Sequence, residues 1–100
     1  MRPAPSSSTR PTLALVGATG RFAEAIVSAL ALRDDVWGEI RLLAPGVTTR
    51  TLSVRGSEEP IEVLREGSFE GVDVALFTPS PEIPPEWTAR AVAAGAVVVD

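Results

Sequence analysis

Residues 13–30 read LALVGATGRFAEAIVSAL, and this stretch carries the strongest structural signal in the chain. Its uncharged apolar run ends at Gly17, two glycines bracket Ala-Thr, and apolar residues then recur at the spacing of a helix. The pattern predicts a strand over 12–16 that is buried on both faces, a tight glycine turn, and a helix over about residues 21–32.

The two glycines have separate predicted roles. Gly17 lets the chain leave the strand sharply, and Gly20 lets the backbone at the start of the helix approach a bulky group. The free N–H groups and the positive end of the helix dipole then form an anion site, typically for a pyrophosphate. Ala23 occupies the third small position, so the spacing Gly-x-x-Gly-x-x-Ala is a variant of the dinucleotide fingerprint. The same turn also occurs with a purely structural role, but a strand before it and a helix after it favour a dinucleotide site.

The end of the second predicted strand bears on which dinucleotide is bound. An NAD-selective site usually has Asp or Glu there, to hold the ribose 2′-hydroxyl. The strand predicted over 39–44, EIRLLA, has Glu39 at its beginning and ends in LLAPG, and the nearest following cation is Arg50. The missing acid and the nearby arginine favour NADP, with NAD as the alternative. A solvated loop charge explains Arg50 equally well.

A hairpin is predicted after the second strand. TLSVR at 51–55 and IEVLR at 61–65 alternate apolar and polar residues, and GSEEP lies between them. This pattern is typical of two paired strands with one solvated face.

The rest of the chain completes an alternating order of strands and helices. Buried strands are predicted over 72–77 and 96–100, and the helix between them is expected to begin at Pro84 or Pro85 and to end before Gly95. Buried strands that alternate with helices predict an α/β fold. We therefore expect a Rossmann-like, doubly wound, mainly parallel sheet with an inserted β-hairpin.

The composition excludes several classes of site and partner. The net charge of −4 argues against a nucleic-acid partner or an anionic membrane surface. The chain has no Cys and no His, so it has no disulfide, no thiol nucleophile and no imidazole base, and a zinc site is not expected. No apolar run approaches the ~20 residues that span a bilayer.

One domain is predicted, preceded by a short tail. Residues 1–11, MRPAPSSSTRP, lack the apolar segment of a secretory signal and are expected to form a disordered N-terminal tail. No repeat or internal boundary interrupts the pattern after them, so 12–100 is predicted to be a single NAD(P)-binding, Rossmann-like domain.

Four stretches resemble the N-terminal part of the aspartate-semialdehyde dehydrogenase family. They are LALVGATG at 13–20, EIRLLA at 39–44, SFEGVDVALF at 68–77 and AVAAGAVVVD at 91–100. The glycine turn is shared with many reductases, whereas FEGVDVALF followed by AAGAVVVD is more specific. The resemblance implies a cytoplasmic, homodimeric enzyme that reduces aspartyl phosphate to aspartate semialdehyde with NADPH, for lysine, threonine and methionine biosynthesis. It also implies that the catalytic domain is absent from these 100 residues.

The resemblance also assigns cofactor-binding residues. It implies that the backbone of one turn meets the cofactor phosphates, and this turn consists of Gly17, Thr19, Gly20, Arg21 and Phe22. It implies that Ala44 and Pro45 approach the adenosine. Thr78 matches a family serine that follows the third buried strand. Arg50 completes the candidate set. No catalytic or metal-binding residue is assigned, because the family's cysteine and histidine come later than residue 100.

Three positions depart from the family's pattern. Ala23 stands where the family generally has glycine, PGVTT replaces an arginine-serine pair that holds the 2′-phosphate, and TPSPEIPP replaces a glycine-rich turn. Three interpretations therefore stay open. The chain is the cofactor-binding portion of an NADP-dependent semialdehyde dehydrogenase, a degenerate homologue that serves as a binding or scaffolding protein, or part of a neighbouring reductase such as an N-acetyl-glutamyl-phosphate reductase relative or an extended short-chain dehydrogenase.

Overall fold

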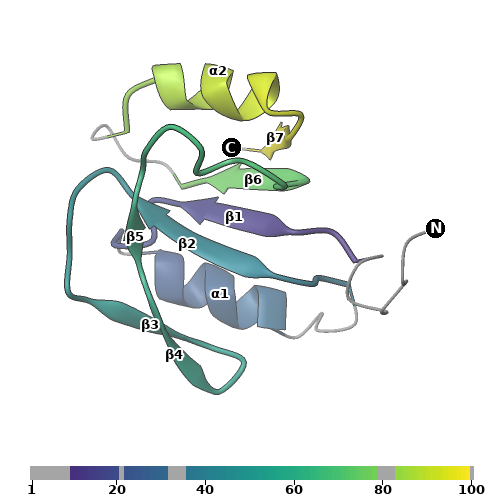
Figure 1. The fold of residues 1–100 in the computed structure, drawn as a ribbon. Helices are drawn as coiled ribbons and strands as arrows, with labels where there is room; N and C mark the ends of the chain where they lie inside the picture. Colours follow the sequence, from purple (N-terminus) through teal and green to yellow (C-terminus); the bar gives the residue numbers. More distant parts are fainter. Residues whose placement is uncertain (1–9, 21, 32–35, 79–82, 100) are drawn as a thin grey trace.

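A five-stranded parallel sheet forms the centre of the molecule (Figure 1). The computed structural model describes residues 10–20, 22–31, 36–78 and 83–99, so most of the predicted tail lies outside it. The strand order is β5-β2-β1-β6-β7 and every neighbouring pair is parallel. The sheet strands are β1 (Leu13–Val16), β2 (Ile40–Ala44), β5 (Glu62–Val63), β6 (Val74–Phe77) and β7 (Val97–Val99).

The two helices cover opposite faces of this sheet, which confirms the doubly wound α/β prediction. Helix α1 (Ala23–Ala31) shares one face with a separate hairpin, β3 (Thr51–Val54) and β4 (Ser57–Pro60). Helix α2 (Glu86–Ala93) packs on the other face. Within the described residues, neither helix is long and apolar enough to cross a membrane.

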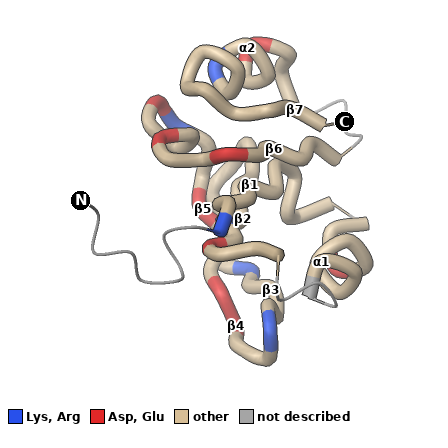
Figure 2. The backbone as a smooth tube through the Cα atoms, turned by 90° about the vertical axis from the view of Figure 1, so that its right-hand side faces the viewer, with Lys and Arg blue, Asp and Glu red and all other residues tan. Residues whose placement is uncertain are grey.

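Strand β1 is buried on both sides, as its uncharged sequence predicts. All four of its side chains are buried, since Ala14 and Val16 pack toward α2 while Leu15 packs toward α1. Figure 2 shows charged residues on the hairpin and on loops, and none on β1. The strand therefore lies at the centre of the core, with β2 on one side and β6 on the other.

The chain reverses its direction of travel across the sheet next to β1. It runs from β1 through α1 to β2 and outward to β5, and then returns to β6 on the opposite side of β1. In open parallel sheets this reversal opens a crevice at the carboxyl ends of the strands. The glycine turn after β1 lies at this place.

Helix α2 begins at Glu86, one residue after the later of its two predicted starts, and ends before Gly95 as predicted. Pro85 is the N-cap residue and Glu86 the first helical residue, because a missing N–H costs nothing in the first turn. Ala94 is the C-cap, and Gly95 follows it and donates its N–H to the Val92 carbonyl oxygen over 3.0 Å. Trp87 lies 6.5 Å from Phe69 between ring centroids, which anchors the helix on the core.

The predicted pairing of the hairpin is wrong. The residues 51–55 do not pair with 61–65, because β3 pairs with β4 inside the segment that we assigned to the loop. Arg55 and Gly56 have φ angles of 54° and 82°, as a two-residue type I′ turn requires, and the twist of that turn suits two strands. The following segment leaves the hairpin, and β5 pairs in parallel with β2 at the edge of the sheet.

The final strand is also less buried than we predicted. In β7 the side chains of Val97 and Val99 are 65% and 46% exposed, because β7 is an edge strand that α2 covers on one face only. Strand β6 begins at Val74, later than predicted, and its residues Val74 and Leu76 are only half-buried. An uncharged apolar run therefore predicted these strands without predicting which faces are covered.

The hairpin turn offers a direct test of its conformation. Replacing Gly56 with alanine should destabilise the fold by about 1–2 kcal/mol, because a Cβ is strained at positive φ although nothing lies within 4 Å of it. Replacing Gly46, which also has open space but no positive φ, should cause no loss. Urea unfolding followed by circular dichroism would compare the two, and equal effects would contradict the type I′ turn.

Candidate functional site

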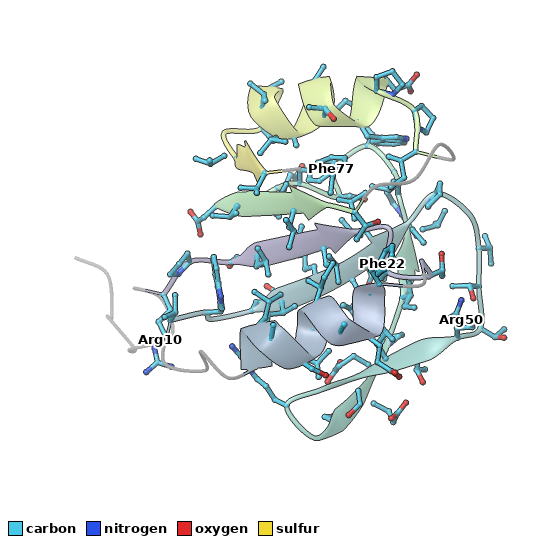
Figure 3. The ribbon with its side chains drawn as sticks, turned by 180° about the vertical axis from the view of Figure 1, so that it is seen from behind. Arg10, Phe22, Arg50 and Phe77 are labelled. Carbon is cyan, nitrogen blue, oxygen red and sulfur yellow. The ribbon has the colours of Figure 1, made fainter. Side chains whose placement is uncertain are left out.

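The candidate site lies where three neighbouring strands end. Val16, the last residue of β1, is paired with Leu43 of β2 and with Phe77 of β6. The glycine turn, the loop after β2 and Thr78 therefore meet at one end of the sheet. Figure 3 shows Phe22 and Arg50 at this end and Arg10 at the opposite end.

The glycine turn is fastened to the end of β2 through its backbone. The N–H groups of Gly17 and Ala18 both donate to the Leu43 carbonyl oxygen, over 2.8 and 3.0 Å. The Gly20 N–H donates to the Gly17 carbonyl oxygen over 2.9 Å and closes the turn. Within the part of the chain that the structure describes, the N–H groups of Thr19 and Phe22 have no hydrogen-bond acceptor. These two donors stand at the N-terminus of α1, where the dipole favours an anion.

Thr78 fills the space above Gly17. Gly17 has a φ of 97°, and a Cβ on it would lie 2.0 Å from the Thr78 Oγ1 atom. Thr78 is buried, donates its N–H to the Val16 carbonyl oxygen over 3.0 Å, and donates its hydroxyl to the Gly17 carbonyl oxygen over 3.5 Å. Thr78 thus borders the turn, and its hydroxyl is directed at the turn's own backbone.

Gly20 also faces the protein itself. A Cβ on Gly20 would lie 3.1 Å from the Gly17 carbonyl oxygen and 3.8 Å from the Thr78 Oγ1 atom. A Cβ at this position would therefore need a shift of a few tenths of an ångström in the Gly17 carbonyl oxygen. The approach of a bulky ligand to this position stays a prediction.

The loop after β2 supplies the other side of the site. Ala44 is buried and its carbonyl oxygen accepts the Leu64 N–H over 2.7 Å, so its side chain belongs to the core. Pro45 beside it is half-buried. No acidic residue occurs between Ala44 and Arg50, so the carboxylate that would hold a ribose 2′-hydroxyl is absent from this loop.

Arg50 reaches the glycine turn across 31 residues of sequence. Its Nη1 atom donates to the Thr19 carbonyl oxygen over 2.8 Å, at an exposed position. Its backbone N–H donates to the Thr48 Oγ1 atom over 3.0 Å, which shapes the loop. The structure therefore brings the predicted cation into contact with the predicted phosphate turn.

Two predicted features lie outside the described residues. Arg21 is one of them, and the other is residues 79–82 of the segment TPSPEIPP. Phe22 is described, and its side chain is 56% exposed beside the start of α1.

The residues present fit an anionic group at this turn. Two N–H groups without an acceptor among the described residues, the positive end of α1 and the Arg50 guanidinium all lie at one exposed edge. The chain carries no thiol and no imidazole.

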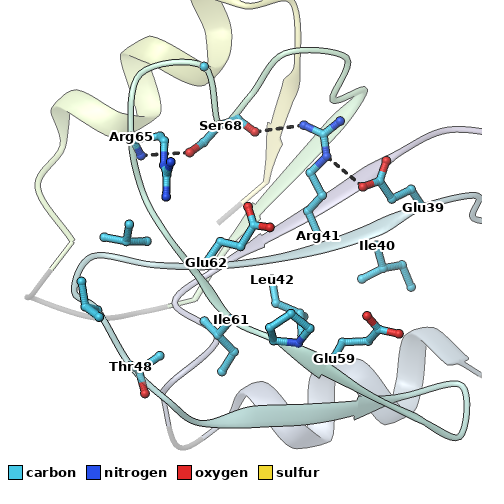
Figure 4. A pocket seen from close by; sticks show the side chains of 14 residues that line it. Glu39, Ile40, Arg41, Leu42, Thr48, Glu59, Ile61, Glu62, Arg65 and Ser68 are labelled. Carbon is cyan, nitrogen blue, oxygen red and sulfur yellow. Dashed lines mark hydrogen bonds and ion pairs between the residues drawn. The ribbon is translucent and has the colours of Figure 1, made fainter.

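A second hollow lies away from the turn, and sequence reasoning missed it. It has a volume of about 820 Å³ and lies between β2, β5 and the hairpin (Figure 4). Its charged groups are partly engaged with one another, since Arg41 donates to the Glu39 carboxylate over 3.1 Å and to the Ser68 carbonyl oxygen over 3.1 Å. None of the candidate cofactor-binding residues that the structure describes lines it. Its lining is scattered over residues 39–68, so no local motif could have revealed it.

Comparisons with known proteins agree with the fold. No family model matches the chain. Aspartate-semialdehyde dehydrogenase from Synechocystis is 33% identical over 89 residues, and the enzyme from Legionella pneumophila is 37% identical over 92 residues. Each match covers 88% of this chain and 26% of the relative.

A solved structure gives the same result. The probable aspartate-semialdehyde dehydrogenase from Pseudomonas aeruginosa superposes with a TM-score of 0.80 and 30% identity, covering 90% of this chain and 27% of that one. The chain spans about a quarter of the length of the curated relatives that it matches. The chain is thus similar, in both sequence and fold, to about a quarter of the length of aspartate-semialdehyde dehydrogenases.

Proposed function

We propose that the chain is the cofactor-binding portion of an NADP-dependent aspartate-semialdehyde dehydrogenase. The whole protein would reduce aspartyl phosphate to aspartate semialdehyde, as a cytoplasmic homodimer that serves lysine, threonine and methionine biosynthesis. The observation that carries the proposal is the glycine turn at the carboxyl end of β1, with the Arg50 guanidinium beside it and two N–H donors that have no acceptor in the described part of the chain. Residues 12–100 would be the cofactor-binding domain and residues 1–11 a tail.

Each described candidate residue has a part in this proposal. The Thr19 and Phe22 N–H groups would donate to the pyrophosphate at the start of α1, while Gly17 and Gly20 give the turn its shape. The adenosine would lie beside Ala44 and Pro45, which follow one another at the carboxyl end of β2. Thr78 would act as a positioning residue that holds the turn. The bound coenzyme would supply the hydride, and these residues would hold and orient it.

Titration of the purified 100-residue chain tests this proposal. We expect saturable binding of NADPH, with NADH as the weaker ligand. At a free concentration of about 100 times Kd, the ligand should raise the unfolding free energy by about 2.7 kcal/mol, which a thermal shift measures alongside calorimetry. We also expect no turnover of aspartate semialdehyde, since the chain has neither Cys nor His. A folded chain that binds neither coenzyme would contradict the proposal.

The second candidate is a degenerate homologue that keeps the fold and serves as a binding or scaffolding protein. Two departures on the expected cofactor surface favour it, since PGVTT stands at 45–49 and a Pro-rich segment follows Thr78. A folded chain without coenzyme affinity would support this candidate. An N-acetyl-glutamyl-phosphate reductase relative would bind the same coenzymes, and only the substrate of the whole protein would separate it from the first proposal.

A further inference from the structure

We propose that Arg50 is the residue that selects a coenzyme with a 2′-phosphate, so that the cation comes from the residue before β3 and not from the end of β2. This inference rests on the proposed coenzyme binding and names the specificity of that same site. The segment that follows β2 lacks both an acid and an arginine until position 50. Arg50 is then the first charged residue after the strand.

The hairpin explains how a residue so far from β2 reaches the site. Strand β3 begins directly after Arg50, and its side chains Leu52 and Val54 pack in the same cluster as Ala23 and Val27 of α1. This packing holds the start of β3 against the helix. Arg50 is therefore presented to the turn that begins the helix, and its bond to Thr19 follows from that placement.

The guanidinium has donors left for a ligand. One N–H group, on Nη1, is used by the Thr19 carbonyl oxygen, and a guanidinium carries five. Among the described acidic residues, none forms an ion pair with Arg50. These residues therefore do not neutralise its charge, and the hydrogen bond to Thr19 fixes the orientation of the guanidinium.

The chemistry of this edge suits a phosphate and not a ribose hydroxyl pair. A phosphate accepts two parallel N–H bonds from an arginine fork, whereas a 2′-hydroxyl gains most from a carboxylate acceptor. The loop offers the hydroxyls of Thr48 and Thr49 next to Arg50, and no carboxylate. The Thr48 hydroxyl already accepts the Arg50 N–H and keeps the loop in this shape.

The test compares two coenzymes on matched variants. In the 100-residue chain, Arg50→Met should weaken NADPH binding about 10- to 100-fold and NADH binding less than about 3-fold. Arg90→Met is the control, because it removes the same charge from α2, where Arg90 lies 5.2 Å above the Trp87 ring. It should leave both affinities unchanged. Arg50→Lys should give an intermediate loss, since a lysine keeps the charge without the fork.

The outcomes separate this inference from the proposed function. An equal loss of both coenzymes in Arg50→Met would overturn the selectivity and leave Arg50 as a support of the turn. A chain that binds neither coenzyme would overturn the proposed function together with the inference. Salt dependence gives a second measurement on the unaltered chain, since NADPH binding should weaken more steeply with salt than NADH binding. Equal salt slopes would contradict the role of Arg50 even if the variant did not fold.

Discussion

Replacing Gly17 with alanine is expected to lower the unfolding free energy by about 3–5 kcal/mol. Two costs add at this position. The backbone has a φ of 97°, which an L side chain rarely adopts, and the new Cβ would lie 2.0 Å from the Oγ1 atom of buried Thr78. Since domains are stable by about 5–15 kcal/mol, this loss would leave little margin. Urea unfolding followed by circular dichroism measures it.

A double-mutant cycle isolates the contact with Thr78. Thr78→Ala removes the Oγ1 atom and leaves its Cβ 3.3 Å from the new methyl group, so the clash is relieved while the φ strain remains. The double variant should therefore lose about 1–3 kcal/mol less unfolding free energy than the sum of the losses in Gly17→Ala and Thr78→Ala alone. Strict additivity would show that the contact is not a source of the cost.

Truncating Leu43 to alanine should also lower the unfolding free energy strongly, by about 2–5 kcal/mol. The Leu43 side chain is 1% exposed and packs in the cluster that contains Val16 and Phe77, so its removal opens a cavity beneath the turn. In a chain of this size the melting temperature should fall by about 10–30 °C.

Val47→Ala is the matched control for Leu43, because its side chain is 89% exposed just beyond the same strand. Its melting temperature should stay within a few degrees of the unaltered chain, consistent with surface effects of about ±0.5 kcal/mol. If the melting temperature of Leu43→Ala also stayed within a few degrees of the unaltered chain, the packing assigned to β2 would be wrong. Scanning calorimetry of both variants makes the comparison.

The sequence predicted best the elements whose local pattern admits one arrangement. An uncharged run before a glycine turn and a helical spacing after it specify β1, the turn and α1, because burial on both faces and the strand–turn–helix order agree. The predicted hairpin pairing was wrong because alternation over 61–65 is typical of any strand with one solvated face, and it does not specify whether that strand pairs with 51–55 or with another strand. In the structure Ile61 and Leu64 are buried on opposite faces of the sheet, as the chain passes its edge. Arg55-Gly56 is the turn that joins the two strands of the actual hairpin.

The candidate site was predictable in position more than in contacts. Strand ends in a parallel sheet share an edge, so the strand order alone predicts that the turn, Pro45 and Thr78 lie together. The bond between Arg50 and Thr19 depends on how the hairpin packs on α1, which is tertiary information. The exposure of Val97 likewise depends on which face of β7 a helix covers.

The contact between Thr78 and Gly17 spans 61 residues of sequence, and this separation sets when the site matures during folding. Closing a longer loop costs more chain entropy, so β1, α1 and β2 should associate before β6 joins them. The turn then exists first without the side chain that fills it. Anything that detaches β6 would return the molecule to that earlier stage, in which α1 and the turn are formed and the Thr78 hydroxyl no longer bonds the Gly17 carbonyl oxygen.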